Sequence, residues 1–139
     1  MPVHPYRYKS PDIPLAAIKR FARQIADRFH PDKIILFGSY AYGTPHEDSD
    51  VDLMVIMPSN DVVNQSIRII LALECPFSVD LFVRTPKQVS RALTDGNWLV
   101  MDVMQKGKVL YEARNGKVGS QGRGRLGRGA AAFKSKASA

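Results

Sequence analysis

Apolar residues near the start of the chain recur with a helical period. Steps of three and four residues place them on one stripe, which predicts an amphipathic helix over about residues 15–29. The stripe consists of Leu15, Ile18, Phe21, Ile25 and Phe29. Pro31 ends this helix, because the residue before a proline avoids the helical region. Four prolines among the first fourteen residues indicate an extended lead-in over residues 1–13.

The rest of the body alternates between short apolar runs and helical patterns. Apolar runs at 33–37, 51–57 and 77–84 predict buried strands, and residues 109–111 could add a last short strand. Helical patterns lie at 63–71, 86–95 and 98–105, and a short helical element fits at 40–42. Thr85, Pro86 and Gln88 give the second of these helices a capped start. The order predicts an α/β (α+β) domain: a small mixed β-sheet with helices packed mainly on one side.

Size and composition fit a single soluble domain. The chain has 139 residues, of which 45% are hydrophobic and 24% are charged, values that are ordinary for a globular protein. The single cysteine, Cys75, cannot form an internal disulfide and reads as a buried thiol. The sequence contains neither a membrane-spanning apolar run nor an apolar signal core at its start. We therefore expect a cytoplasmic protein that does not enter a membrane.

The basic charge of the chain is concentrated in its last residues. Of the net charge of +7, six basic residues lie between 115 and 139, where no acidic residue occurs, so residues 1–114 carry only +1. The same stretch holds six of the ten glycines. We expect residues 113–139 to be a disordered Gly/Arg-rich tail, because too few apolar side chains offset the entropy of ordering it. Such tails resemble RNA-binding segments, although a non-functional extension fits as well.

The segment that follows the first strand carries the first chemical signal. Gly38 comes directly after that strand, and the absence of a side chain lets the backbone approach a ligand closely. Ser39 offers a hydroxyl and a backbone N–H at the start of the short helical element, a position that favours phosphate. Tyr40 and Tyr42 could stack on a base or pack under the loop.

Asp50 and Asp52 lie two residues apart at the start of the second strand. Their side chains project from the same face, because strand side chains alternate. Two neighbouring carboxylates repel each other unless a cation lies between them, and Mg²⁺ is a hard cation that joins carboxylates to substrate phosphates. The pair therefore predicts a magnesium site.

Asp80 supplies a third carboxylate from the otherwise apolar strand 77–84. An unpaired aspartate in such a strand is costly. If this strand neighbours the strand of Asp52, the three acids can hold two metal ions that stabilise the attacking and leaving oxygens of a phosphoryl displacement. Asp80 could also accept the proton of the attacking hydroxyl. A structural alternative is that Asp80 pairs with Arg84 or with a helix N-terminus.

The spacing of these residues matches a known pattern. Gly38-Ser39, ten intervening residues and then Asp50-Val51-Asp52 resemble the signature of the DNA polymerase β nucleotidyltransferase superfamily. The short chain is similar to the minimal nucleotidyltransferase branch, and the resemblance covers about residues 14–112. It implies that Gly38 and Ser39 contact the triphosphate of ATP. It also implies that Asp50 and Asp52 bind the metal, expected to be two Mg²⁺ ions, with Asp80 as the third ligand. The catalytic role of Asp80, as acceptor of the hydroxyl proton, is the expectation drawn above from its position.

The resemblance also implies an acceptor. Members of this branch often act as antitoxins that add AMP to a tyrosine of an all-helical HEPN ribonuclease toxin, so a toxin partner is expected for this chain. Many members have arginine where this chain has Tyr42. Any role that the arginine cation has there in binding the nucleotide or a partner is therefore in doubt for this chain.

Two other functions stay open. One is a small-molecule nucleotidyltransferase of the aminoglycoside-resistance type, although the chain has no substantial second domain for such a substrate unless a homodimer supplies it. The other is a non-catalytic protein that binds RNA through the basic tail. The intact set of three aspartates argues against the second function.

Overall fold

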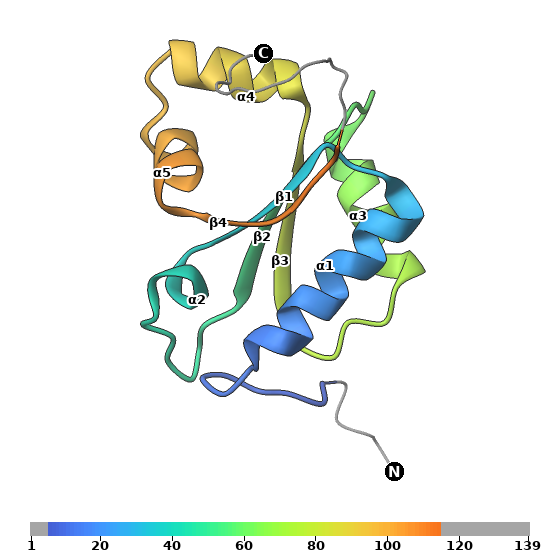
Figure 1. The fold of residues 1–139 in the computed structure, drawn as a ribbon, viewed down its shortest axis with the longest axis vertical. Coiled ribbons are helices and arrows are strands. Elements are labelled where there is room, and N and C mark those ends of the chain that lie inside the picture. The colour runs from blue at the N-terminus through green and yellow to red at the C-terminus, as the bar shows by residue number, and fades with distance from the viewer. Residues whose placement is uncertain (1–5, 115–139) are drawn as a thin grey trace.

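The protein, described by a computed structural model over residues 6–114, is built around one four-stranded sheet (Figure 1). The strand order is β3-β2-β1-β4, in which β1 is antiparallel to β2 and β4 while β2 and β3 are parallel. The elements in chain order are α1 (Leu15–Phe29), β1 (Lys33–Phe37), α2 (Ser39–Tyr42), β2 (Val51–Ile56), α3 (Val62–Ala72), β3 (Val79–Arg84), α4 (Pro86–Thr94), α5 (Trp98–Lys106) and β4 (Lys108–Glu112). The predicted mixed α+β class is confirmed, and the last short strand is present.

The helices are divided unequally between the two faces of the sheet (Figure 1). The larger core lies under α1 and α3, where Ile18, Phe21 and Ile69 pack with strand residues such as Leu36 and Leu53. A smaller cluster on the opposite face joins α4 and α5 to the sheet through Ile35, Met54, Ile56, Val89, Val100 and Val103. The sequence predicted helices mainly on one side of the sheet, and the larger core does lie on one side. In addition, α4 and α5 cover part of the other face.

Local sequence explains where α4 begins. The Thr85 hydroxyl accepts a hydrogen bond from the Gln88 N–H, and the Gln88 side chain accepts one from the Thr85 N–H. This capping box satisfies two backbone donors that the first helical turn leaves unpaired. Pro86 occupies the first helical position, as the sequence predicted.

One end of the sheet collects the residues of interest. β1 ends there, while β2 and β3 begin there, because β2 runs against β1 and along β3. In the resulting register, Phe37 lies opposite Asp52, and Asp52 lies beside Asp80. Strands 51–57 and 77–84 are therefore neighbours, which is the condition that the sequence set for a site of three acids.

The predicted basic tail lies outside the described residues except for positions 113 and 114, and so do residues 1–5 of the lead-in. Ala113 is tied to the body, since its N–H donates to the Asp32 carbonyl at 2.9 Å. Among the helices of residues 6–114, none has the length and apolar character needed to cross a bilayer.

Candidate nucleotidyl-transfer site

The three predicted acids lie on one face of the sheet at one end. Asp52 and Asp80 are register partners on adjacent parallel strands, and Asp50 precedes Asp52 by two residues. Residues at such positions point to the same face. The charges of Asp50 and Asp80 both act on the Asp52 carboxyl group, as expected for neighbouring side chains. The structure thus brings Asp50, Asp52 and Asp80 together, as the sequence analysis required.

The electrostatics of this cluster reflect burial and mutual repulsion. Burial of Asp52, followed by the charges of Asp80 and Asp50, raises the pKa of its carboxyl group to about 6. Burial and the Asp50 charge also raise the pKa of Asp80. Both causes disfavour the charged form. A cation placed among these groups would reverse that penalty, because it would neutralise the repulsion.

Asp80 does not pair with Arg84. The Arg84 guanidinium donates to the Val83 carbonyl at 2.8 Å, and the ion pairs found in residues 6–114 include none with Asp50, Asp52 or Asp80. Four residues along a strand span about 13 Å, so Arg84 lies far from Asp80 on the same face. The structural alternative of an Asp80–Arg84 pair is therefore excluded.

Gly38 lies directly against Asp52. Its backbone has φ 75° and ψ −158°, a region that is essentially restricted to glycine. A Cβ atom at this position would lie only 2.2 Å from Asp52 Oδ2. The site therefore requires glycine for two independent reasons: the backbone conformation and the space that the carboxylate occupies.

The donor chemistry of the cluster suits magnesium. Its ligands would be carboxylate oxygens, which hard divalent cations prefer. Within residues 6–114, however, no three His, Cys, Asp or Glu side chains have the arrangement of a ready metal site. Proximity, donor type and the lack of an ion-paired base within the described part of the chain make the three aspartates a candidate metal site.

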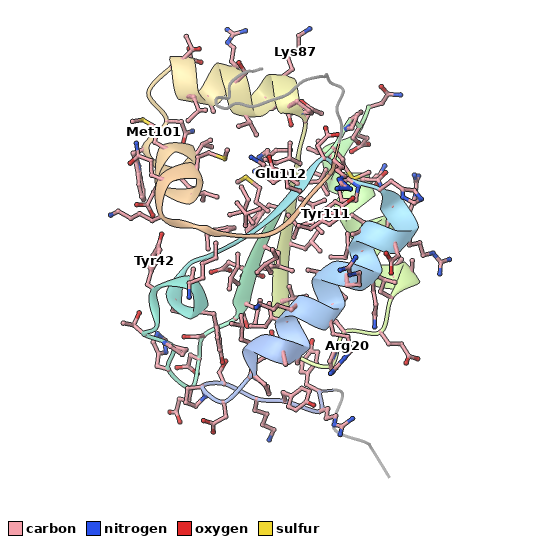
Figure 2. The ribbon with its side chains drawn as sticks, in the orientation of Figure 1. Arg20, Tyr42, Lys87, Met101, Tyr111 and Glu112 are labelled. Atoms are coloured by element: carbon pink, nitrogen blue, oxygen red, sulfur yellow. The ribbon has the colours of Figure 1, made fainter. Side chains whose placement is uncertain are left out.

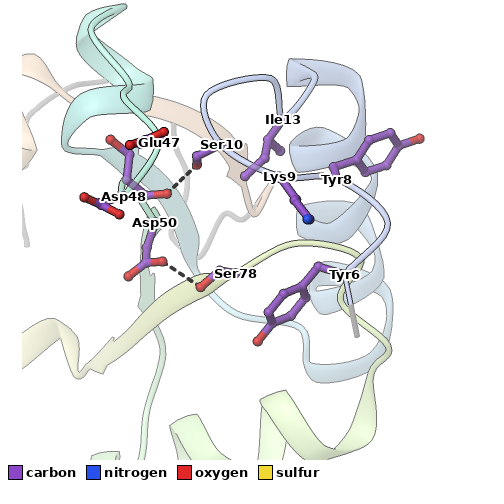
Figure 3. A pocket seen from close by; sticks show the side chains of 10 residues that line it. Tyr6, Tyr8, Lys9, Ser10, Ile13, Glu47, Asp48, Asp50 and Ser78 are labelled. Atoms are coloured by element: carbon purple, nitrogen blue, oxygen red, sulfur yellow. Dashed lines mark hydrogen bonds between the residues drawn. The ribbon is translucent and has the colours of Figure 1, made fainter. Parts of the chain in front are cut away.

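Ser78 is a site residue that the sequence analysis did not identify. Its hydroxyl donates to Asp50 Oδ1 at 2.6 Å (Figure 3), and so it fixes the orientation of that carboxylate. Ser78 lies two residues before Asp80, so the alternation of strand side chains already placed it on the face of the aspartates. That spacing was the signal that could have revealed it.

The turn before β2 is also tied to the N-terminal segment. The His46 N–H donates to the Ser49 hydroxyl at 2.8 Å, and the Ser49 N–H donates to the His46 carbonyl at 2.9 Å. The Ser10 hydroxyl donates to the Ser49 carbonyl and also lies 2.8 Å from the Tyr40 hydroxyl. These bonds hold the chain in place just before Asp50.

A pocket of about 530 Å³ opens beside Asp50 (Figure 3). The segment expected to be only a lead-in forms one wall, and the loop before β2 forms another. The lining residues are Tyr6, Tyr8, Lys9, Ser10, Ile13, Glu47, Asp48, Ser49, Asp50 and Ser78. Glu47 and Asp48 are exposed residues of the loop before β2 and also line this pocket.

The two tyrosines of α2 have separate roles. Tyr40 packs against the larger core and contacts Ser10. Tyr42 reaches from α2 toward α5, where its hydroxyl donates to Asp102 Oδ2 at 2.5 Å (Figure 2). Lys106 Nζ lies 3.3 Å from the other oxygen of Asp102. Tyr42 therefore links the element that follows Gly38 to the helix on the second face of the sheet.

Comparisons with known proteins agree with this architecture. Residues 18–99, more than half of the chain, match the sequence model of a family described as a nucleotidyltransferase domain. A protein of Methanocaldococcus jannaschii that carries the provisional name protein adenylyltransferase is 28% identical over 100 residues, which are 68% of this chain and 95% of that protein.

A solved structure supports the fold. The crystal structure of a Sulfolobus solfataricus protein, provisionally named a nucleotidyltransferase, superimposes with a TM-score of 0.50 at 18% identity. The match covers 70% of this chain and 79% of that one. With the sequence match over residues 18–99, the conclusion is that this chain belongs to the nucleotidyltransferase domain family.

Proposed function

We propose that the protein transfers AMP from ATP to a hydroxyl group of a protein acceptor, in a reaction that requires magnesium. The observation that carries this proposal is the meeting of Asp50, Asp52 and Asp80 on one sheet face, with Gly38 against Asp52. The family match supports nucleotidyl transfer. The provisional name of the M. jannaschii relative supports a protein as the acceptor.

In this proposal, the backbone at Gly38 and the hydroxyl of Ser39 hold the triphosphate beside Asp52. Asp50 and Asp52, with Asp80 as the third ligand, would hold two Mg²⁺ ions, which supply charge neutralisation at the transferring phosphate. Ser78 keeps the Asp50 carboxylate oriented through its 2.6 Å hydrogen bond. The carboxylates and the triphosphate repel each other without the metal, so binding of ATP and binding of magnesium depend on one another.

Asp80 would receive the acceptor. Its side chain is the most exposed of the three, so a hydroxyl group can reach it from solvent. Its ionised carboxylate could then accept the proton of that hydroxyl as a general base. The acceptor oxygen then forms a bond to the α-phosphorus, the bond between that phosphorus and the bridging oxygen breaks, pyrophosphate leaves, and Asp80 takes the hydroxyl proton.

The resemblance of the Gly-Ser and Asp-x-Asp motifs to minimal nucleotidyltransferases suggests the acceptor. We propose an antitoxin role, in which a tyrosine of a HEPN-type toxin receives AMP. A helical protein encoded beside this one would be the first acceptor to test.

The test uses ATP labelled at either the α- or the γ-phosphate, together with magnesium and the candidate acceptor. Transfer of AMP leaves the α label on protein and the γ label in solution, whereas a kinase would do the reverse. We expect the label to disappear with EDTA and with the Asp52→Asn variant. The matched control is Asp95→Asn, which removes an exposed carboxylate just after the end of α4 that pairs with Arg91. Full labelling in excess EDTA would refute metal dependence.

A further inference from the structure

Two aromatic rings lie beside the acids on the same face of the sheet. Phe37 is opposite Asp52 in the register, and Phe82 follows Asp80 by two residues, so both share the face of the aspartates. Their ring centroids are 5.9 Å apart, with an angle of 45° between the ring planes. Because β2 separates β1 from β3, these rings meet above β2. Phe37 also packs against the apolar cluster under α4 and α5, so the pair of rings joins that cluster to the end of the sheet that carries the aspartates.

Phe82 is held on two sides but remains open to solvent. Phe37 contacts one side of its ring, and the Arg84 guanidinium carbon lies 5.9 Å from its centroid. Arg84 is itself fixed by its hydrogen bond to the Val83 carbonyl. Even so, 38% of Phe82 is exposed, at the edge strand of the sheet. A ring that is fixed in orientation and left partly exposed can stack against a second ring without reorganising.

We infer that Phe82 is a specificity-determining residue for the acceptor: it stacks against an aromatic ring that carries the hydroxyl group and places that hydroxyl at Asp80. This inference rests on the proposed function, in which Asp80 receives the acceptor. Phe82 and Asp80 are separated by about 6.6 Å along the strand. That separation is comparable to the reach of a stacked phenol ring together with the hydrogen bond of its hydroxyl.

The position in the sheet favours the acceptor over the nucleotide as the bound ring. Gly38, which is proposed to approach the triphosphate, follows β1, and β2 lies between that strand and β3. Asp80 and Phe82 both belong to β3, on the side of the sheet away from Gly38. An aliphatic hydroxyl, such as that of serine, has no ring to place on Phe82 and gains nothing from it. The acceptor that this surface favours is therefore a hydroxyl group carried on an aromatic ring, which the tyrosine probe below represents.

The experiment uses N-acetyl-tyrosinamide and N-acetyl-serinamide as acceptor probes. Binding to the metal-free protein is measured by saturation-transfer NMR, and AMP transfer is measured with α-labelled ATP and magnesium. The variants are Phe82→Leu and Phe82→Trp. The control is Val109→Ala, which changes a 52% exposed residue on the opposite edge strand.

We expect the wild type to prefer the tyrosine probe. Phe82→Leu should raise the dissociation constant and KM for that probe about three- to tenfold, the scale of one lost aromatic contact. Its affinity for ATP and its rate with the serine probe should stay within twofold of wild type. Phe82→Trp should retain the preference, and Val109→Ala should resemble wild type.

Three results would overturn the inference: an unchanged tyrosine-to-serine ratio in Phe82→Leu, a loss confined to ATP affinity, or a metal-free wild type that binds the tyrosine probe no more tightly than the serine probe. The second result would mean that the ring holds the nucleobase. Failure of the proposed function has a different signature. In that case the wild type would release no pyrophosphate that depends on Asp80, as judged with Asp80→Asn, whatever residue occupies position 82.

Discussion

Replacement of Gly38 by alanine tests the contact between the loop and the acid cluster. The new Cβ would lie 2.2 Å from Asp52 Oδ2 and 3.2 Å from Asp52 Cγ. An ordinary contact needs about 1 Å more, so the Asp52 carboxylate must move by about that distance. The backbone at φ 75° and ψ −158° adds strain of about 1–3 kcal/mol for any residue with a side chain.

Backbone strain and displacement of the Asp52 carboxylate should affect different properties: the first lowers stability and the second lowers the transfer rate. Backbone strain should lower the free energy of unfolding by about 1–3 kcal/mol. Displacement of the carboxylate should lower the transfer rate by about 100-fold, because a misplacement of about 1 Å in a reacting site has consequences of that size. Chemical unfolding measures the first loss, and single-turnover transfer of AMP measures the second.

Gly43→Ala separates strain from displacement. Gly43 also has a positive φ, of 80°, but no atom lies within 4 Å of a Cβ built there. We expect this variant to lose about 1–2 kcal/mol of stability from its left-handed backbone, while its transfer rate stays near wild type. Equal transfer rates in Gly38→Ala and Gly43→Ala would refute the reasoning, since they would show that the position of Asp52 does not matter.

Three further predictions concern residues outside the acid cluster. Truncation after Arg114 should leave the transfer rate within tenfold of the full chain, because every proposed site residue lies before it; a greater loss would place the tail in the site. Burial raises the pKa of Cys75 to about 11, so the thiol stays protonated at pH 8, and iodoacetamide should modify it about 100-fold more slowly than an exposed cysteine. Tyr42→Phe should raise the pKa of Asp102, because the hydrogen bond from Tyr42 is the main cause of its lowering; an unchanged carboxyl titration by NMR would contradict that contact.

Local spacing was sufficient to predict the elements and the first part of the site. The helix of residues 15–29, the capping box at Thr85 and the placement of Asp50 beside Asp52 all follow from contacts within a few residues. Such patterns depend on helix and strand periods, which a single sequence displays. The sequence could not establish that Asp80 lies beside Asp52, because this neighbourhood requires the parallel pairing of β2 with β3.

Features that depend on long-range contacts were not predictable in the same way. The N-terminal segment lines the pocket beside Asp50 because the Tyr8 N–H donates to the Pro76 carbonyl and Ser10 contacts the turn at Ser49. No periodicity signals those contacts. The meeting of Phe37 with Phe82 likewise depends on the strand order, which brings two chain segments 45 residues apart to one face. The placement of α4 and α5 on the second face also depends on tertiary packing.

In the proposed function, three aspartates with separate tasks carry out metal-dependent nucleotidyl transfer. The most direct measurement compares ATP affinity by calorimetry, with and without magnesium, and single-turnover transfer in Asp50→Asn, Asp52→Asn and Asp80→Asn, with folding checked by circular dichroism. Asp50→Asn and Asp52→Asn should lose both magnesium-dependent ATP affinity and rate. Asp80→Asn should bind ATP nearly normally and transfer AMP more slowly by about two or more orders of magnitude. Wild-type transfer by Asp80→Asn would contradict its assigned role, and full activity in both Asp50→Asn and Asp52→Asn would contradict the nucleotidyl-transfer site itself.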